Sequence, residues 1–274
     1  MLSKLGVCAA FASCIAACSC SRAQEAPSQP GEPSRPSAPR APERPRTRRP
    51  APLPPTVETI AMDDGGAYRL HRWSFPSAGT RFDLVDLGMT GPLDTPLRES
   101  RGSLLFNAGF FTDDGRPDGL SLAHGREESP LRRELSGGVL SITRGIAHLH
   151  ESETFALPSG TDFAVQCRPR LVVDGRVNIR TDDGRRADRT ALCVRDRGAA
   201  LELYVARTDH PTGMGGPTLF TLATELLRRG CEQALNLDGG PSTGVAWRQS
   251  ETEVRLLRPR GPVRQGIRVT LPNR

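Results

Sequence analysis

Short runs of hydrophobic residues, each bounded by Gly, Pro or Asp, recur along the chain from residue 57 onward. Such runs predict β-strands, because successive side chains of a strand point to opposite faces of a sheet. The expected strands are Tyr68–Phe75, Arg81–Leu87, Ser103–Phe106, Val139–Ile142, Phe163–Gln166, Leu171–Val173, Thr190–Val194, Leu201–Ala206, Ala234–Leu237 and Val245–Trp247. The pattern indicates a mixed α/β (α+β) fold with an antiparallel-rich β-sheet core and few helices.

Two turns join neighbouring runs into hairpins. Asp174-Gly175 separates Leu171–Val173 from Arg176–Ile179, and Asp-Gly favours the type I′ turn of a two-residue hairpin. Asp196-Arg197-Gly198 separates the next two expected strands in the same way. Both connections are short, so the strands that they join should be antiparallel.

One segment shows helical periodicity. Leu219, Leu222, Ala223, Leu226 and Leu227 form an apolar stripe at the spacing of an α-helix. Pro217 is expected in the first turn, while Arg228-Arg229 followed by Gly230 marks the end, where cations and a glycine are favoured.

The first twenty residues differ from everything that follows. Lys4 precedes an apolar run from Leu5 to Ala17, which is too short for a transmembrane helix of roughly 20 residues. This pattern predicts a cleaved signal peptide at residues 1–20.

Two cleavage sites compete. Ile15-Ala16-Ala17-Cys18 resembles a bacterial lipobox, in which Cys18 becomes the lipidated first residue, whereas Ser21-Arg22-Ala23 fits ordinary signal peptidase. Either way the protein is expected outside the cytoplasm, in the periplasm or on the outer surface. The lipobox further predicts a lipoprotein that is anchored to the membrane through Cys18.

Residues 21–56 form a tether rich in Pro and Arg. Proline recurs at every third position from Pro27 to Pro45, which matches the turn of a polyproline II helix and cannot bury a core. At the polyproline rise, the stretch from Pro27 to Pro55 spans about 90 Å. The remaining residues, 57–274, are expected to fold as one domain.

Charge is concentrated outside that domain. Seven Arg and three Glu give residues 22–56 a net charge of +4, and Lys4 adds one more charge to the total of +6. The domain is therefore nearly neutral, and no nucleic-acid partner is expected. Of its three cysteines, Cys167, Cys193 and Cys231, two should pair in an oxidising compartment, and the sequence does not say which.

Two segments have unusual strand ends, where a polar side chain stands beside glycine. They are Phe106-Asn107-Ala108-Gly109-Phe110-Phe111 and Leu235-Asn236-Leu237-Asp238-Gly239-Gly240-Pro241-Ser242-Thr243-Gly244. Glycine accepts a positive φ and has no Cβ, so backbone N–H groups there can approach a ligand closely.

These two segments resemble the phosphodiester glycosidase family. The resemblance extends to Gln166 with Pro169, Leu171–Gly175 and Arg189–Ala191, in the family's order across nearly the whole domain. It implies a hydrolase of sugar 1-phosphodiesters that acts on a saccharide or sugar-phosphate. Two departures surround the expected site: Pro241 replaces a glycine, and Cys167-Arg168 replaces Ser-Gly or Ala-Gly.

For such a substrate the chemistry needs a carboxylate and a cation, because the phosphate leaving group is already a stable anion. Asp238 is the candidate carboxylate, and Arg189 is the candidate for the phosphate, which a guanidinium can hold by two oxygens. The groups expected to bind substrate are Asn107, Gly109, Gln166, Gly239, Gly240, Ser242 and Thr243. No cofactor is predicted, and nothing in the sequence supports a required divalent cation.

Plainer interpretations stand beside each assignment. Asp238 also suits a turn or a calcium ligand, Arg189 also suits an ion pair with Asp188, and Asn107 also suits a structural role. An envelope lipoprotein of the same fold that binds polysaccharide without cleaving it is the alternative function.

Two other motifs are set aside. Gly240–Gly244 matches G-x-S-x-G, the nucleophile elbow of α/β-hydrolases, but a strand rather than a helix is expected after it, and no His follows His210. His148 and His150 share one strand face but have no third metal ligand nearby in the sequence, so an exposed polar face is expected.

Overall fold

The computed structural model describes residues 51–272. The expected leader, Cys18 and most of the tether therefore lie outside the described residues. Leu53, at the start of the described part, donates its backbone N–H to Arg248 O and packs on the main core. Residues 51–272 belong to one compact unit.

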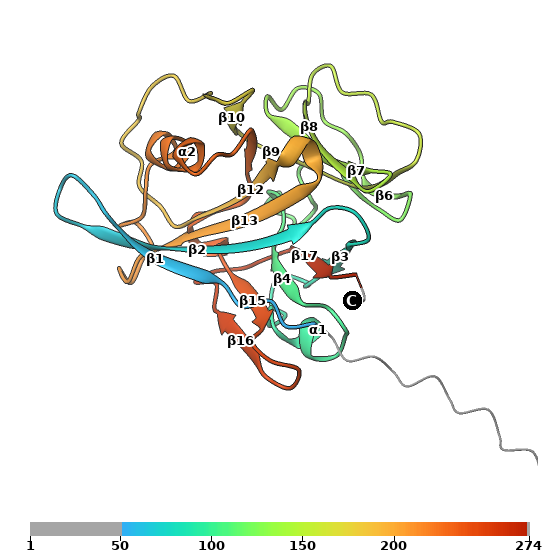
Figure 1. The fold of residues 1–274 in the computed structure, drawn as a ribbon, viewed down its shortest axis with the longest axis horizontal. Coiled ribbons are helices and arrows are strands. Elements are labelled where there is room, and N and C mark those ends of the chain that lie inside the picture. The colour runs from blue at the N-terminus through green and yellow to red at the C-terminus, as the bar shows by residue number, and fades with distance from the viewer. Residues whose placement is uncertain (1–50, 273–274) are drawn as a thin grey trace, which may run out of the picture. The chain divides into compact units, whose positions relative to one another are not determined.

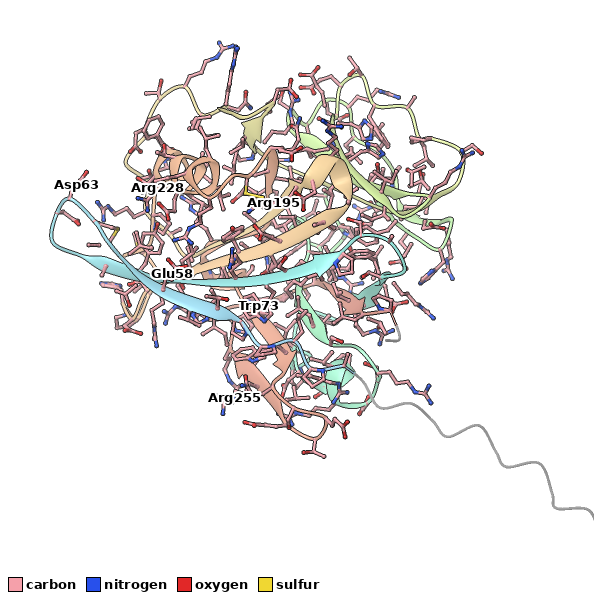
Figure 2. All side chains as sticks on the ribbon, viewed as in Figure 1. Glu58, Asp63, Trp73, Arg195, Arg228 and Arg255 are labelled. Carbon is pink, nitrogen blue, oxygen red and sulfur yellow. A yellow bond between two sulfur atoms is a disulfide. The ribbon has the colours of Figure 1, made fainter. Side chains whose placement is uncertain are left out.

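A seven-stranded sheet runs through this unit in the order β1-β2-β13-β12-β14-β10-β11, and all of its pairings are antiparallel. Its strands are β1 (Thr56–Ala61), β2 (Ala67–Pro76), β10 (Arg170–Val173), β11 (Arg176–Val177), β12 (Arg189–Arg195), β13 (Ala200–Arg207) and β14 (Gln233–Asn236). The hairpin of β1 and β2 projects from the unit, with Asp63 at its tip (Figure 1 and Figure 2).

Two five-stranded antiparallel sheets complete the architecture. One has the order β16-β15-β4-β17-β3, with β3 (Arg81–Asp86), β4 (Leu104–Asn107), β15 (Val245–Arg248), β16 (Val254–Leu257) and β17 (Gln265–Thr270). The other has the order β6-β5-β9-β7-β8, with β5 (Ser121–Ala123), β6 (Arg126–Ser129), β7 (Gly138–Thr143), β8 (Ile146–Glu151) and β9 (Thr161–Cys167). The expected antiparallel-rich fold is thus confirmed.

Helices are few in the described residues. They are α1 (Thr95–Arg98), α2 (Leu219–Arg228) and the 3-10 turns η1 (Asp196–Gly198) and η2 (Gly240–Ser242). None of them is long and apolar enough to cross a membrane. The helix α2 begins later than expected: Thr218 is its N-cap and accepts a hydrogen bond from Thr221 N–H, so Pro217 precedes the first turn instead of entering it.

The apolar side chains form two main cores on opposite faces of the seven-stranded sheet. On one face α2 packs Leu222, Ala223 and Leu226 against the sheet. On the other face the three sheets share a core that includes Trp73, Phe106 and Phe163. Figure 1 shows α2 on one side of β12 and β13, with β15 and β16 across β2 from it.

The hairpin turn at Asp174-Gly175 forms as expected, because both residues have positive φ, at 49° and 67°. The second strand of this hairpin is shorter than the expected Arg176–Ile179, since β11 ends at Val177. Asn178 then donates its side-chain amide to Arg170 O at 2.9 Å.

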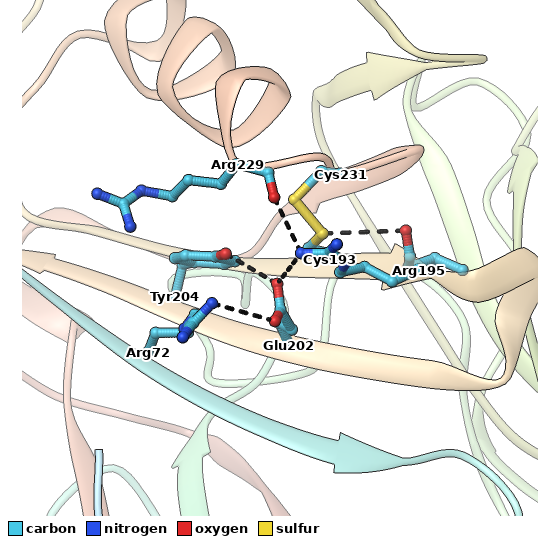
Figure 3. Close-up of a disulfide and its surroundings, with 8 residues drawn as sticks. Arg72, Cys193, Arg195, Glu202, Tyr204, Arg229 and Cys231 are labelled. Atoms are coloured by element: carbon cyan, nitrogen blue, oxygen red, sulfur yellow. Dashed lines mark hydrogen bonds and ion pairs between the residues drawn. A yellow bond between two sulfur atoms is a disulfide. The ribbon is translucent and has the colours of Figure 1, made fainter. Parts of the chain in front are cut away.

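A disulfide joins Cys193 on β12 to Cys231, which follows α2, while Cys167 is a buried free thiol. The disulfide therefore ties the helix to the sheet beneath it. Beside it, the buried Glu202 carboxylate accepts a hydrogen bond from Tyr204 and forms ion pairs with Arg72 and Arg195 (Figure 3).

His71 on β2 should make the fold sensitive to acid. Its ring is buried against Trp73, both ring nitrogens are without hydrogen-bond partners in the described part of the chain, and burial lowers its pKa to about 4. The unfolded chain then binds a proton that the folded chain excludes, so stability falls as the pH drops from about 6.5 to about 4. We expect the free energy of unfolding of the wild type to fall by about 2 kcal/mol over this pH range, as measured by urea unfolding. His71→Phe should remove this loss.

The same substitution at the exposed His148 is the control and should leave the pH dependence unchanged. An equal acid sensitivity in the wild type and in His71→Phe would contradict this prediction.

Candidate functional site

Asn107 links three segments at the end of β4. Its side chain is buried, and its amide donates to Asp238 O at 2.6 Å. Its carbonyl oxygen accepts the Thr190 hydroxyl at 2.9 Å and Gly244 N–H at 3.2 Å. Asn107 thereby joins β4 to β12 and to both ends of the Asp238–Gly244 loop. This arrangement makes it a positioning residue.

Asp238 lies two residues after the end of β14, and its backbone N–H donates to Ala108 O at 3.2 Å. One carboxylate oxygen accepts Gly239 N–H at 2.9 Å. Burial raises the pKa of Asp238 to about 6, although the hydrogen bond from Gly239 N–H acts to lower it. No cation of residues 51–272 forms an ion pair with it. A carboxyl group that titrates near neutral pH suits proton transfer.

Two glycines shape the turn after Asp238. Gly240 has φ of +57°, a conformation that residues with a Cβ rarely adopt, and its N–H donates to Asp188 O at 2.7 Å. A Cβ on Gly239 would stand 3.0 Å from Asp188 O and 3.8 Å from Arg189 Cδ. The turn therefore rests directly on the backbone and side-chain stem of Arg189.

The Arg189 guanidinium is held by backbone carbonyls. It donates to Arg185 O at 2.7 Å and to Pro217 O at 3.3 Å, and burial lowers its pKa. Within the described residues no carboxylate lies in ion-pair distance of it, so the alternative pairing with Asp188 does not form. An arginine that is oriented but has no bound counter-ion is suited to an anionic ligand.

A buried ion network supports the Thr243 end of the Asp238–Gly244 loop. The fully buried Asp188 carboxylate contacts Arg207 Nε and Arg260 Nε, each at 3.2 Å. Arg207 also donates to Thr243 O at 2.7 Å. Sequence reasoning missed both arginines, because only the folding brings residues 188, 207 and 260 together.

Ser242 and Thr243 are both buried. The Ser242 hydroxyl donates to Pro262 O at 3.0 Å, whereas the Thr243 hydroxyl has no partner among residues 51–272. The β-strand β15 follows directly, so Gly240–Gly244 lacks the helix of a nucleophile elbow.

Gln166 and Gly109 meet at the end of β9. The Gln166 side chain accepts the N–H groups of Leu120 and Arg132, each at 3.0 Å, and donates to Arg132 O at 2.7 Å. A Cβ on Gly109 would come within 2.9 Å of Gln166 O. Gly109 thus permits a close backbone approach, and Gln166 holds two loops with its polar atoms.

Arg168 is a second cation in this region. Its guanidinium lies 5.1 Å from the centre of the Phe110 ring and 3.4 Å from the Asp118 carboxylate. The neighbouring Cys167 thiol has its pKa raised to about 12, chiefly by burial, and the charge of Asp238 adds to that rise. The Cys167 thiol therefore lies near Asp238. In the sequence, Cys167-Arg168 stood out only as a departure from the family pattern.

Asn107 contacts the Asp238 backbone directly, and the turn after Asp238 packs on the stem of Arg189. Gly239, Gly240, Ser242 and Thr243 form that turn and its continuation, and Gln166 and Gly109 flank the adjoining strand end. Among residues 51–272, Cys193, Glu202 and Cys231 are the one group with metal-ligand spacing, and its two cysteines are joined in the disulfide. The rings of His148 and His150 on β8 are tilted against each other with centroids 5.8 Å apart, and neither belongs to a group with metal-ligand spacing among residues 51–272.

Comparison with known proteins points to one family. The family model of phosphodiester glycosidases matches residues 102–270, which include every candidate site residue of the folded domain. No curated protein matches the sequence.

Fourteen solved chains have a matching fold. One is the catalytic domain of zebrafish N-acetylglucosamine-1-phosphodiester alpha-N-acetylglucosaminidase, auto-inhibited by its pro-peptide, with a TM-score of 0.62 and 14% identity over 81% of this chain and 83% of that chain. Another is a hypothetical protein from Synechocystis, with a TM-score of 0.58 and 16% identity over 79% of this chain. The match spans 62% of the Synechocystis chain. At these identities the likeness shows a shared fold.

Proposed function

The chain belongs to the phosphodiester glycosidase family, and we propose that it is an exported hydrolase of glycosyl phosphodiesters or related envelope saccharides. The observation that carries the proposal is the Asp238 carboxylate. It is partly buried, has no described counter-ion, and precedes a turn that rests on Arg189. The turn that follows the expected proton acceptor thus packs on the stem of the expected anion-binding residue.

In the proposed reaction Asp238 takes a proton from a water molecule whose oxygen attacks the anomeric carbon. The bond from that carbon to the phosphate oxygen breaks, and its electron pair leaves with the phosphate monoester. Arg189 binds the phosphate oxygens and stabilises the charge that develops on them. Asn107 holds Asp238 in place through the 2.6 Å bond to its carbonyl oxygen. The free sugar, the phosphate monoester and one proton are the products.

The proposal places the protein outside the cytoplasm, as the apolar run from Leu5 to Ala17 predicts. Lipidation of Cys18 would anchor it to a membrane, and the proline-rich tether would let the domain reach envelope polymers about 90 Å away.

A second candidate function is binding of polysaccharide without cleavage. It is favoured by the Arg189 guanidinium, whose hydrogen bonds to Arg185 O and Pro217 O leave fewer N–H groups for a reacting phosphate. It differs from the first only in the chemical step.

Hydrolysis of a defined substrate separates the two candidates. The full-length mature protein is incubated with the methyl phosphodiester of N-acetylglucosamine 1-phosphate and with its glucose analogue. Release of free sugar together with methyl phosphate supports the hydrolase. Binding of either compound by calorimetry, with no product after prolonged incubation, supports the second function.

Arg189→Ala should lower kcat/KM on these substrates by about 100-fold, because a positioned donor to the developing anion is lost. Arg189→Lys should recover part of the activity, since a charge remains but the two-pronged contact does not. Arg185→Ala is the matched control, because Arg189 uses only the backbone carbonyl of Arg185 and the Arg185 side chain is exposed. Equal activity in Arg189→Ala and Arg185→Ala would remove Arg189 from the site.

A further inference from the structure

A second concave surface lies away from the Asp238 site. It is a half-open groove of about 490 Å³ between β3, β7 and the start of β9. Its size is in the range of small-molecule sites, about 300–1,000 Å³. Phe82, Ile142 and Phe163 contribute an apolar floor, and the polar lining comes from Ser77, Thr80, Arg81, His124 and Asp162.

One wall of the groove is built around Asp83, a buried carboxylate on β3. Burial alone would raise the pKa of Asp83, but hydrogen bonds from His124, Arg81 and Arg268 bring it below its usual range. His124 contacts Asp83 at 2.7 Å and Arg81 donates at 2.8 Å. The imidazole and the guanidinium are therefore held in fixed positions at the edge of the groove.

The backbone at His124 is also constrained. His124 has φ of +52°, and its N–H donates to Asp162 O at 2.6 Å. Left-handed backbone is costly for a residue with a large side chain, so the surrounding contacts must hold it there. The result is that the imidazole of His124 and the carboxylate of Asp162 border the same groove.

Ser77 supplies an independent sign of an unfilled site. It lines the groove, is fully buried, and its hydroxyl has no hydrogen-bond partner among residues 51–272. A buried hydroxyl without a partner costs free energy, which a ligand that offers a hydrogen bond would recover.

The groove is separate from the Asp238 site. Asp162 and Phe163 line the groove at the start of β9. Cys167 is at the opposite end of this strand, and the charge of Asp238 contributes to its raised pKa. Five residues of extended strand separate Asp162 from Cys167, a distance of about 16 Å.

We propose that this groove binds an uncharged saccharide unit. Arg81 and Arg268 both form ion pairs with Asp83, and Asp162 adds a second carboxylate to the lining, so the groove has no excess of positive charge that would select an anion. A sugar ring presents C–H groups to an apolar floor and hydroxyls to its rim. Ser77, His124 and Asp162 are the partners for those hydroxyls. The groove binds envelope polysaccharide at a distance from the reacting bond.

The arrangement supports binding rather than a second hydrolytic centre. Asp83 and His124 resemble the acid and base of a catalytic triad, but Ser77 makes no hydrogen bond to His124. Without that bond, Ser77 has no base to activate it as a nucleophile.

Calorimetry with the full-length mature protein tests the groove. Maltotriose and chitotriose are the neutral probes, and trigalacturonate is the acidic one. We expect a neutral probe to bind with a Kd on the order of 1 mM. His124→Asn should weaken binding about tenfold through the loss of a hydrogen bond, and Asn tolerates the left-handed backbone. Ser77→Val should act similarly if its melting curve shows a folded protein.

Arg255→Gln is the control, because Arg255 lies on β16, an exposed edge strand outside the groove (Figure 2). It should bind the neutral probe as the wild type does. His124→Asn should also leave turnover of small phosphodiesters unchanged, so failure of the groove and failure of the proposed hydrolase activity are distinguishable.

Three results would overturn the proposal. They are no binding of either neutral probe at about 20 mM, well above the expected Kd, tighter binding of trigalacturonate, and binding that Arg189→Ala abolishes while His124→Asn does not. The last result would assign the saccharide to the Asp238 site.

Discussion

Asp238→Asn should abolish turnover and stabilise the folded protein at neutral pH. Removal of a general base commonly costs between about 100-fold and 10,000-fold in rate, and we expect a loss of at least 1,000-fold here. The amide keeps the shape of the carboxyl group and can still accept Gly239 N–H, so the loop should keep its conformation.

The gain in stability follows from the raised pKa of Asp238. Its folded value, about 6, lies above the ordinary 3.8, so the folded state binds a proton more readily than the unfolded state. The wild type therefore loses stability as the pH rises from about 4 to about 6 and remains less stable above that range. At pH 7.5 the free energy of unfolding of Asp238→Asn should be about 1–2 kcal/mol higher than that of the wild type, and this difference should vanish near pH 3.5.

Urea unfolding at several pH values, together with the phosphodiester assay, measures both effects. Asp63→Asn is the control, because Asp63 is exposed at the tip of the β1–β2 hairpin (Figure 2). In the wild type, kcat/KM should rise with pH through about 6 as Asp238 loses its proton. Full activity in Asp238→Asn would falsify the assignment of Asp238 as the base.

Asn107→Ala should cost about 4 kcal/mol of stability. The change leaves Asp238 O, the Thr190 hydroxyl and Gly244 N–H without their partner, and each buried polar group without a partner costs about 1–3 kcal/mol. For a domain of this size that corresponds to a fall in Tm of about 8–16 °C. Thermal unfolding and urea titration measure it directly.

Activity should fall as well, by about 100-fold at temperatures where the variant is folded, because a small misplacement of a catalytic group has a large effect on rate. The midpoint of the pH–rate profile should also move from about 6, since Asp238 would no longer be held in its buried position. Asn178→Ala removes a single amide hydrogen bond in the β10–β11 hairpin and should cost about 1 kcal/mol, with no change in activity. Equal costs for the two Asn variants would contradict the role of Asn107.

The strands of the domain could be predicted because their causes are local. Alternating side chains identify β2, a continuous apolar run identifies β12, and Asp174-Gly175 identifies a hairpin through its tolerance of positive φ. Strands with weaker patterns escaped prediction. β1 is almost entirely exposed and β5 has three residues, so neither shows a hydrophobic alternation long enough to recognise.

The sequence predicted the positions of some site residues but not their roles. Asp238 and Asn107 stand beside glycines at strand ends, which drew attention to them in the sequence. What Asn107 does could not be predicted, because its partner Asp238 is 131 positions away and a hydrogen bond at that separation exists only in the folded chain.

The sequence by itself determined the antiparallel-rich strand pattern, the helix before β14, the family and the two strand-end segments, because each depends on residues that are neighbours in the chain. Three further features depend on the tertiary structure. The first is which cysteines pair. The second is that Asp188 forms ion pairs with Arg207 and Arg260 and not with Arg189, and the third is that Asp83, His124 and Ser77 lie at one groove. Each of these is a contact between segments far apart in sequence. Burial also depends on segments that are far apart in sequence, because the raised pKa of Asp238 results from the sheets that exclude water from its carboxyl group.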